Sequence, residues 1–278
     1  MCTKVFNKRK LPPFKLNSSP INNEAKSIPM KKFVSLSVIP VSNQTDNMSK
    51  PTGLNHEGKA TLTIATALFL CINGVLFFSP LYGWWSYPAL VITLGLLCFF
   101  FYFFRDPQRV FPSEDTENVV VSPADGTVVT VEEVDEPDHF GDRRIMISVF
   151  MSVFSVHANW YPVNGTVTKV EHQDGNFHAA FKPKASTENE RSLVVIETPE
   201  GTPVMMRQIA GALARRVVTY SKPGDQSRIN SHMGFIKFGS RVDVYLPTGS
   251  LVCVKVGEKV CGDVSILAKL PAADTSKA

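Results

Sequence analysis

Five regions of this 278-residue chain concentrate the residue types that carry chemistry. They combine serine, histidine, aspartate and arginine with glycine or proline, and they stand at residues 104–109, 122–126, 154–165, 187–191 together with 208–216, and 234–243. A serine hydroxyl becomes a useful nucleophile only beside a base, and a histidine oriented by an aspartate is the usual arrangement. Arginine binds carboxylate or phosphate oxygens through two parallel hydrogen bonds. The residue types therefore allow nucleophilic chemistry, acid–base chemistry and anion binding.

Taken singly, each region also has an ordinary structural explanation. Ser122-Pro-Ala-Asp-Gly126 is a good turn sequence, in which Asp125 makes the turn. His157 lies between apolar residues, as a hydrogen-bonded core histidine would. The pair Gly239-Ser240 is compatible with a bulge at the start of a strand. No single region identifies a function.

In combination the regions resemble the phosphatidylserine decarboxylase family, and its short form in particular, over roughly residues 100–270. The chain contains, in order, Phe-Phe-Arg-Asp-Pro, Ser-Pro-Ala-Asp-Gly, Val-His-x-Asn, Asn-Glu-Arg, Gln-Ile-Ala-Gly-x-x-Ala-Arg-Arg and Phe-Gly-Ser-Arg-Val-Asp. Each piece is common by itself. The joint occurrence of all six by chance is negligible, so the resemblance is specific.

The resemblance implies that the chain cuts itself between Gly239 and Ser240. The Ser240 hydroxyl would attack the Gly239 carbonyl, where the missing side chain allows close approach. Elimination and hydrolysis would then leave a pyruvoyl group on an α chain of residues 240–278, which stays bound to a β chain of residues 1–239. The pyruvoyl ketone would form a Schiff base with the amine of phosphatidylserine and release phosphatidylethanolamine and CO2.

The base that drives cleavage is less clear from the motifs than the cleavage site. Asp125 and His157 match the family's Asp-Gly and first histidine positions. The longer form has a second histidine three residues further on, where this chain has Trp160, and indole cannot act as a base. Either His157 serves both cleavage and decarboxylation, or another group substitutes for the missing histidine. His172 is the leading substitute, and His232 is a second possibility.

The candidates for binding the substrate's phosphate or carboxylate are basic side chains of these regions: Arg191, Arg215, Arg216, Lys237 and Arg241. We rank Arg215 and Arg216 first among them, although a solvated or salt-bridged pair is their ordinary role. Arg105 and Arg109 directly follow an apolar stretch. We expect these two to anchor that stretch at the membrane interface.

The apolar stretch itself predicts a helical membrane hairpin within residues 48–105. Residues 61–104 contain no Asp, Glu, Lys, Arg or His, and two apolar runs (61–78 and 89–104) flank a segment with two prolines and a glycine. Each run is at the short end for a spanning helix of about 20 residues, and the aromatic residues between them suit the interface. Basic residues flank both outer ends, so we predict a cell-membrane protein whose catalytic domain faces the cytoplasm.

From Val119 onward the sequence predicts strands. Short β-branched segments are bounded by Gly, Pro or Asp, and helical periodicity is largely missing. We therefore expect residues 106–278 to form a mainly β (α+β) catalytic domain, a sandwich or barrel of the phosphatidylserine decarboxylase type. Residues 254–264 resemble a half-motif of a lipoyl-type β-sandwich, with two short strands joined by a glycine-containing turn.

Charge and cysteine content exclude other classes. Residues 1–60 hold ten Lys and Arg and three acids, a net charge of +7. Because the whole chain has a net charge of +4, residues 61–278 carry −3. The body is therefore not that of a nucleic-acid-binding protein. The five cysteines lack CxxC spacing, so no zinc site or disulfide framework is predicted. Residues 1–47 read as a disordered basic tail, which we interpret as a start-site artefact, with Met48 as the better start.

Two other functions remain open at this point. One is a pyruvoyl decarboxylase of a soluble amino acid, which would not require the apolar hairpin. The other is a non-catalytic, membrane-tethered β-sandwich module, which would not cleave itself. The phospholipid decarboxylase is the interpretation that uses both the motifs and the hairpin.

Overall fold

A computed structural model gives the fold, and it describes residues 53–79, 83–113, 116–176, 178, 188–211, 216–237 and 239–271. The chain divides into two units, Met1–Met48 and Ser49–Ala278. All described residues belong to the second unit. The predictions for residues 1–47 and for Arg215 lie outside the described residues.

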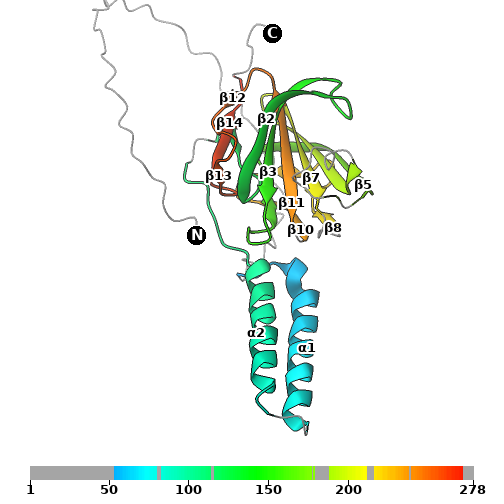
Figure 1. Cartoon of the computed structure of the whole chain (residues 1–278). Coiled ribbons are helices and arrows are strands. Elements are labelled where there is room, and N and C mark those ends of the chain that lie inside the picture. The colour runs from blue at the N-terminus through cyan, green and yellow to red at the C-terminus, as the bar shows by residue number, and fades with distance from the viewer. Residues whose placement is uncertain are drawn as a thin grey trace, which may run out of the picture. The chain divides into compact units, whose positions relative to one another are not determined.

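The N-terminal part of the second unit is a helical hairpin (Figure 1). After a short 3-10 helix, η1 (His56–Gly58), come α1 (Lys59–Phe78) and α2 (Ser86–Phe103). Helix α1 ends where Ser79 turns extended, as expected for a residue that precedes a proline. Asn73 Nδ2 of α1 donates to Thr93 Oγ1 of α2 at 3.0 Å, which ties the two helices together.

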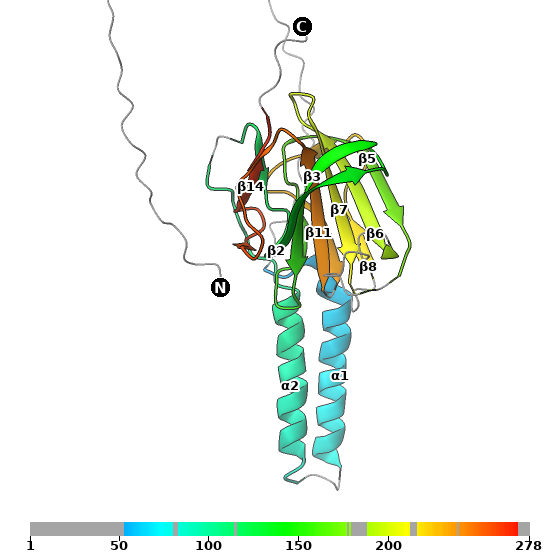
Figure 2. The ribbon, with the colours of Figure 1, turned by 45° about the horizontal axis from the view of Figure 1, so that its top comes forward.

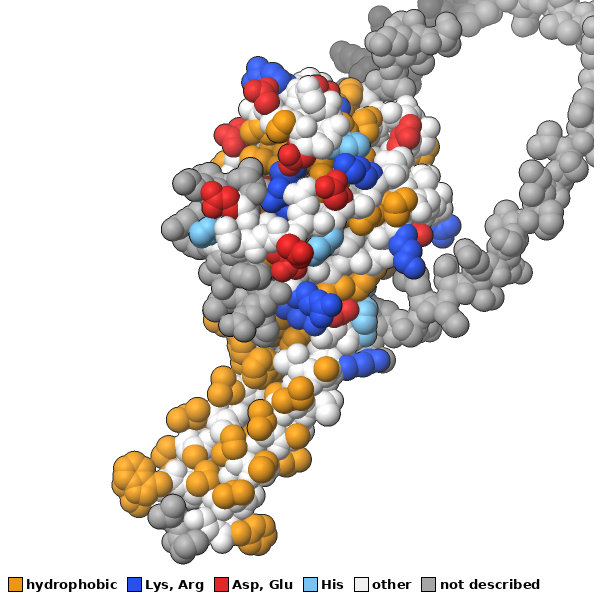
Figure 3. Space-filling model, turned by 90° about the vertical axis from the view of Figure 1, so that its right-hand side faces the viewer, with side chains coloured by type: hydrophobic (Ala, Val, Ile, Leu, Met, Phe, Trp, Pro, Cys, Tyr) orange, Lys and Arg blue, Asp and Glu red, His pale blue; other side chains and the backbone are white. Residues whose placement is uncertain are grey.

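The surface of the hairpin is apolar. Both helices are long and apolar enough to cross a membrane, and many of their large hydrophobic side chains are exposed. Figure 3 shows hydrophobic side chains along the hairpin, whereas charged side chains cover the body and the base of the hairpin. Such an exposed apolar surface favours association with a membrane.

The body is built around one eight-stranded sheet in which neighbouring strands are antiparallel. Its strands, in spatial order, are β13 (Lys259–Val260), β2 (Gly126–Glu136), β3 (Asp142–Met151), β11 (Ser240–Pro247), β7 (Pro203–Ala210), β6 (Arg191–Glu197), β5 (Gly165–Gln173) and β9 (Gln226–Ser227). Figure 2 shows how the sheet curls between β2 and β5. Strand β11 lies in the interior of the sheet, and all of its residues except Pro247 are buried.

Two three-stranded sheets complete the body. One has the order β1 (Val119–Val121), β14 (Ile266–Lys269), β12 (Leu251–Val252), and the other has the order β4 (Ala158–Trp160), β10 (His232–Lys237), β8 (Arg216–Thr219). The predicted β-rich body with a preceding helical hairpin is thus confirmed.

The segment 254–264 differs from its prediction. Only Lys259–Val260 is a strand, and the first arm of the expected strand pair is irregular. The reason lies in the backbone partners. Gly257, at φ +88°, donates its N–H to the carbonyl of Val128 at 2.7 Å. The N–H of Val128 donates to the carbonyl of Glu258 at 2.8 Å. The turn therefore bonds to β2 instead of pairing its own two arms.

Candidate active site

The Gly239–Ser240 bond joins a bend at Gly239 to the first residue of the buried strand β11. Ser240 is fully buried and pairs with Met151 of β3 on one side and Ala210 of β7 on the other. Gly239 has φ +66°, the left-handed region that glycine adopts with least strain. A Cβ on Gly239 would meet no atom within 4 Å, so conformation, not space, requires glycine here.

His157 contacts this junction directly. It is fully buried, and its Nε2 accepts a hydrogen bond from the N–H of Gly239 at 3.2 Å. Its Nδ1 lies 2.9 Å from the carbonyl oxygen of Ser155. Because Nε2 is an acceptor, the ring proton belongs on Nδ1 and is donated to Ser155. Burial lowers the pKa of His157 to about 4, so the imidazole is neutral near pH 7.

The base of the hairpin forms one wall of the histidine pocket. Phe103, the last residue of α2, has its ring centroid 4.2 Å from that of His157. Phe103 belongs to an apolar cluster with Phe104, Val156, Ala158, Trp160 and Phe235. Arg105 reaches back from the end of α2 and donates to the carbonyl of Phe154 at 2.7 Å. The hairpin and the site residue His157 therefore share one core.

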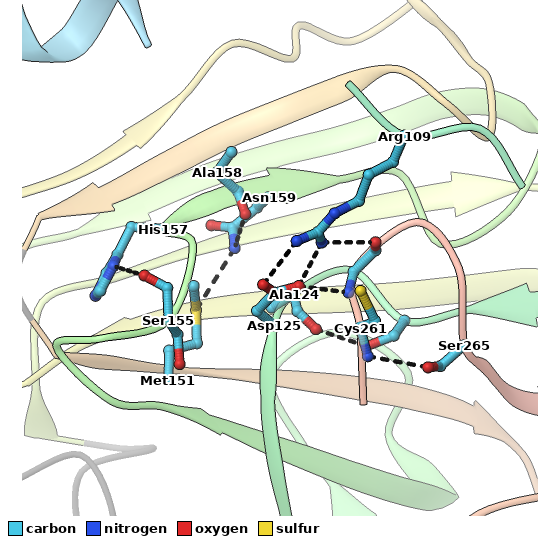
Figure 4. A network of polar contacts seen from close by, with 12 residues as sticks. Arg109, Ala124, Asp125, Met151, Ser155, His157, Ala158, Asn159, Cys261 and Ser265 are labelled. Atoms are coloured by element: carbon cyan, nitrogen blue, oxygen red, sulfur yellow. Dashed lines mark hydrogen bonds and ion pairs between the residues drawn. The ribbon is translucent and has the colours of Figure 1, made fainter. Parts of the chain in front are cut away.

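Asp125 lies in a different pocket, where it is paired with Arg109. Both carboxylate oxygens accept from the Arg109 guanidinium, the Nη2–Oδ2 distance being 2.8 Å, and Oδ1 also accepts from the N–H of Gly262 at 2.8 Å. Arg109 in turn donates to the Gly262 carbonyl at 3.0 Å. Figure 4 shows this group beside, and separate from, the His157–Ser155 contact.

Two expectations are corrected by this pocket. Arg109 was expected to anchor the hairpin at the interface, but its side chain is only 12% exposed because it turns into the body to meet Asp125. Asp125 was expected to orient His157, yet the carbonyl of Ser155 does so. The physical reason is that the carboxylate finds a full guanidinium partner in Arg109.

Trp160 fills the place of the second histidine by packing. A Cβ on Gly262 would lie 2.6 Å from the indole, and the guanidinium carbon of Arg109 lies 5.2 Å from the indole centroid. The His232 ring is tilted by 50° against that of Trp160 at a centroid distance of 5.3 Å, and its Nε2 lies 3.2 Å from Asp106 Oδ1. His232 is thereby directed to Asp106.

His172 is separated from Ser240 by two strands. It lies on β5, which reaches β11 only across β6 and β7, a path of about 14 Å at ~4.8 Å per strand. Its Nε2 faces Asp174 at 3.6 Å and Glu190 at 3.7 Å. Of the histidines that the structure describes, His157 is the one hydrogen-bonded to the Gly239–Ser240 segment.

The basic candidates have different surroundings. Lys237 pairs across the sheet with exposed Arg216, and its Nζ forms an ion pair with Glu57 at 3.1 Å. Arg191 begins β6 and is partly buried. Arg241 is buried, with both Nε and Nη2 donating to Asp243 at 2.8 and 3.0 Å. Arg216 is therefore exposed close to the strand end that leads to Gly239, where Lys237 is partly buried and paired with Glu57, whereas Arg241 is engaged in the core.

Three residues near Ser240 were not among the site residues predicted from the sequence: Met151, Asn159 and Gln208. The Ser240 hydroxyl donates to Met151 Sδ at 3.1 Å, and Asn159 Nδ2 approaches the same sulfur at 3.7 Å. Gln208 donates to Asn159 Oδ1 at 2.8 Å. Asn159 and Gln208 stand inside the Val-His-x-Asn and Gln-Ile-Ala-Gly motifs, which was the available signal. For Met151 no sequence signal exists.

Comparison with known proteins decides the family. The model of the family described as phosphatidylserine decarboxylase matches residues 96–268. The phosphatidylserine decarboxylase proenzymes of Phocaeicola vulgatus and Bacteroides thetaiotaomicron are each 53% identical, over 226 and 221 residues, and each match covers 80% of this chain and 96% of the relative. That of Burkholderia multivorans is 45% identical over 215 residues, 77% of this chain and 95% of the relative.

This chain belongs to the phosphatidylserine decarboxylase family. The resemblance predicted from the motifs is therefore confirmed. In this family member, His157 contacts Gly239 on one side and Phe103, at the end of the apolar hairpin, on the other. The Gly239–Ser240 junction therefore lies close to the base of the hairpin.

Proposed function

We propose that this protein is a self-processing, pyruvoyl-dependent decarboxylase that converts phosphatidylserine to phosphatidylethanolamine and CO2 at a membrane surface. The observation that carries the proposal is the contact of neutral His157 with the left-handed Gly239 that precedes buried Ser240. The names of the relatives, phosphatidylserine decarboxylase proenzymes, support both the substrate and a processed precursor.

Self-cleavage begins with attack of Ser240 Oγ on the Gly239 carbonyl carbon. The hydroxyl proton moves to a base, the C–N bond breaks, and an ester joins the two residues while the nitrogen of residue 240 takes up a proton. His157 Nε2 is the unprotonated nitrogen beside this bond and is our candidate for both proton transfers. The hydroxyl is readily released because its present acceptor, the thioether of Met151, is weak.

The second stage removes the Ser240 oxygen. A base takes the Cα proton of residue 240 and the ester C–O bond breaks. The carboxylate of Gly239 departs as the leaving group, and residue 240 becomes dehydroalanine. Hydrolysis by one water releases ammonia and leaves the pyruvoyl group. The site fits such a group, because Ser240 is buried and its backbone is held by β3 and β7 on either side.

The pyruvoyl ketone, once formed, supplies an electrophile for the substrate amine and an electron sink for the carboxylate's electrons. The neighbouring side chains contribute orientation and proton transfer. His157 offers a nitrogen that is neutral near pH 7, and the apolar cluster around Phe103 excludes water. Asp125 serves the site by holding the α-chain residue Gly262 beside Arg109.

The two chains are expected to remain one heterodimer after cleavage. Strand β11 of the α chain is hydrogen-bonded to β3 and β7 of the β chain, and β14 pairs with β1. Breaking the Gly239–Ser240 bond leaves the pairing of Arg241–Pro247 and of β14 in place. The new chain end at Gly239 can move away and open the site to substrate.

Substrate recognition is proposed for the basic side chains near the hairpin base. Lys237 and Arg216 stand side by side on neighbouring strands. Arg191 and, outside the described residues, Arg215 are further candidates from the sequence for the phosphate or carboxylate. The hairpin would hold this edge at the bilayer. Arg105 and Lys59 flank its two ends and support a cytoplasmic location of the body.

Mass spectrometry of the purified full-length protein tests the proposal. We expect two chains, with a fragment of residues 240–278 that begins with pyruvoyl, and one intact chain for Ser240→Ala. Ser240→Cys is expected to cleave slowly through a thioester and to be a poor decarboxylase. An intact wild-type chain would overturn the proposal. Release of CO2 from free serine but not from phosphatidylserine vesicles would favour a soluble substrate.

A further inference from the structure

A buried relay of polar side chains lies behind Ser240. It consists of Ser192 on β6, Thr219 on β8, Gln208 on β7 and Asn159 on β4, so four strands each contribute one member. Ser192, Gln208 and Asn159 are completely buried, and Thr219 is partly buried. Polar side chains in a core are stabilising only when their hydrogen bonds are made. The direction of each bond therefore shows which donor atoms at the end of the relay remain for another partner.

The relay has a defined direction. Thr219 Oγ1 lies 2.6 Å from Ser192 Oγ and donates to Gln208 Oε1 at 2.8 Å. Gln208 Nε2 then donates to Asn159 Oδ1 at 2.8 Å. Because Oδ1 of Asn159 is the acceptor, its Nδ2 must carry the donors to the other side. A Cβ on Gly234 would lie 2.8 Å from Gln208 Nε2, so glycine at this position leaves room for the relay.

The relay ends on a weak acceptor beside the bond that is proposed to break. Asn159 Nδ2 faces the thioether of Met151 at 3.7 Å and the carbonyl of its own neighbour Ala158 at 3.3 Å, as Figure 4 shows. The Ser240 hydroxyl contacts the same sulfur at 3.1 Å. The amide has two hydrogens: one is donated to the Ala158 carbonyl, and the other is directed at a sulfur, which is a weak acceptor. The second hydrogen is therefore available for a stronger acceptor.

We propose that Asn159 is the hydrogen-bond donor that stabilises the oxyanion formed when Ser240 attacks Gly239, and that Gln208 and Thr219 are positioning residues that hold this donor. The inference rests on the proposed self-cleavage. Attack turns the Gly239 carbonyl oxygen into an anion beside the fully buried Ser240, where a preorganised amide donor is effective. His157 Nε2 is already assigned to receive the Ser240 hydroxyl proton in this step, so the oxyanion needs a separate donor.

Asn159→Asp isolates the donor. The substitution keeps the size and the oxygen that accepts from Gln208, and it removes both amide hydrogens. We expect self-cleavage of freshly translated chain in detergent micelles, followed by the appearance of fragment 240–278, to slow about 100-fold at pH 8. As the pH falls, protonation of the new carboxyl restores one donor, so the rate of Asn159→Asp should rise while that of wild type does not.

The Thr219 pair tests the relay without touching the donor. Thr219→Ser keeps the hydroxyl and should cleave at close to the wild-type rate, whereas Thr219→Val loses it and should cleave several-fold more slowly. Gln208→Met should also slow cleavage, but it should add little in the Asn159→Asp background, because a positioning residue acts only through the donor that it holds.

The outcomes separate this inference from the function on which it rests. If wild-type chain stays intact, self-cleavage itself fails. If wild type cleaves and Ser240→Ala does not, but Asn159→Asp cleaves at the wild-type rate across the pH range, the donor role is overturned. Should Asn159→Asp not fold, as judged by a protease-resistant body, equal rates for folded Thr219→Ser and Thr219→Val would overturn it instead.

Discussion

His157 and Asp125 both stand in motifs that the sequence marks as functional, but their pockets differ in electrostatics. His157 lies among aromatic rings, is oriented by a backbone carbonyl and has a pKa lowered by burial. Asp125 lies in an ion pair with Arg109 and accepts from the backbone of Gly262. The first pocket favours a neutral base, and the second favours a fixed charge.

The difference separates two roles that a His–Asp pair would combine. The histidine pocket contacts Gly239, whereas the Asp125 pocket joins Arg109, in the segment after the hairpin, to Gly262 near the C-terminus. We infer that proton transfer belongs to the first pocket and mechanical connection to the second. The following predictions test this division, from the largest expected effect to the smallest.

His157→Gln is expected to have the largest effect. Glutamine can still accept from Gly239 N–H but cannot exchange a proton, so self-cleavage should fall by about 100-fold or more. Time-resolved gel analysis of translated chain measures the rate. Asp125→Asn serves as the matched comparison and should lose far less rate. Equal losses for the two variants would break the division of roles.

Asp125→Asn should instead lower stability. It leaves the Arg109 guanidinium without its charge partner in a pocket where both side chains are little exposed, which costs about 3 kcal/mol of unfolding free energy. Urea unfolding of the uncleaved Ser240→Ala chain measures this value. In the double variant with Arg109→Met the second substitution should cost much less than it does alone; additive costs would contradict the pairing.

The pH dependence of stability should follow His157. The pKa of His157 is lowered from 6.5 to about 4 in the folded chain, so below pH 6.5 the unfolded chain binds the extra proton. The contribution of the buried neutral ring is present above pH 6.5 and is lost as the pH falls toward 4, by about 2 kcal/mol at pH 5. Unfolding of Ser240→Ala at pH 7.5 and pH 5 should show this loss, and adding His157→Gln should reduce it. An unchanged pH dependence would contradict the neutral pocket.

Gly239→Ala is expected to have the smallest effect on stability. The left-handed conformation costs an alanine about 1–2 kcal/mol, and the new methyl group meets no neighbour. The variant should therefore fold and cleave, but more slowly. Circular dichroism and the fragment assay measure both properties. A complete failure of Gly239→Ala to fold would contradict the open space around this position.

The sequence by itself determined much about this protein. The motif around Ser240 and the other five motifs identify the family because each is a short run of neighbouring residues, which can be read without knowing the fold. The hairpin follows from 44 consecutive residues without charge or histidine, residues 61–104, and the β-rich body follows from β-branched segments between turn residues. These are local properties, and local sequence controls propensity, polarity and turn formation.

Only the tertiary structure decided which side chains meet. Arg109 reaches Asp125 across the fold, His172 is excluded by the two strands between β5 and β11, and the relay to Asn159 draws on four strands. Sheet order and curl set these distances, and neither is encoded in the spacing of residues along a strand. The sequence could therefore point to the bond that we propose breaks, whereas the side chains that contact that bond depend on how distant strands pair.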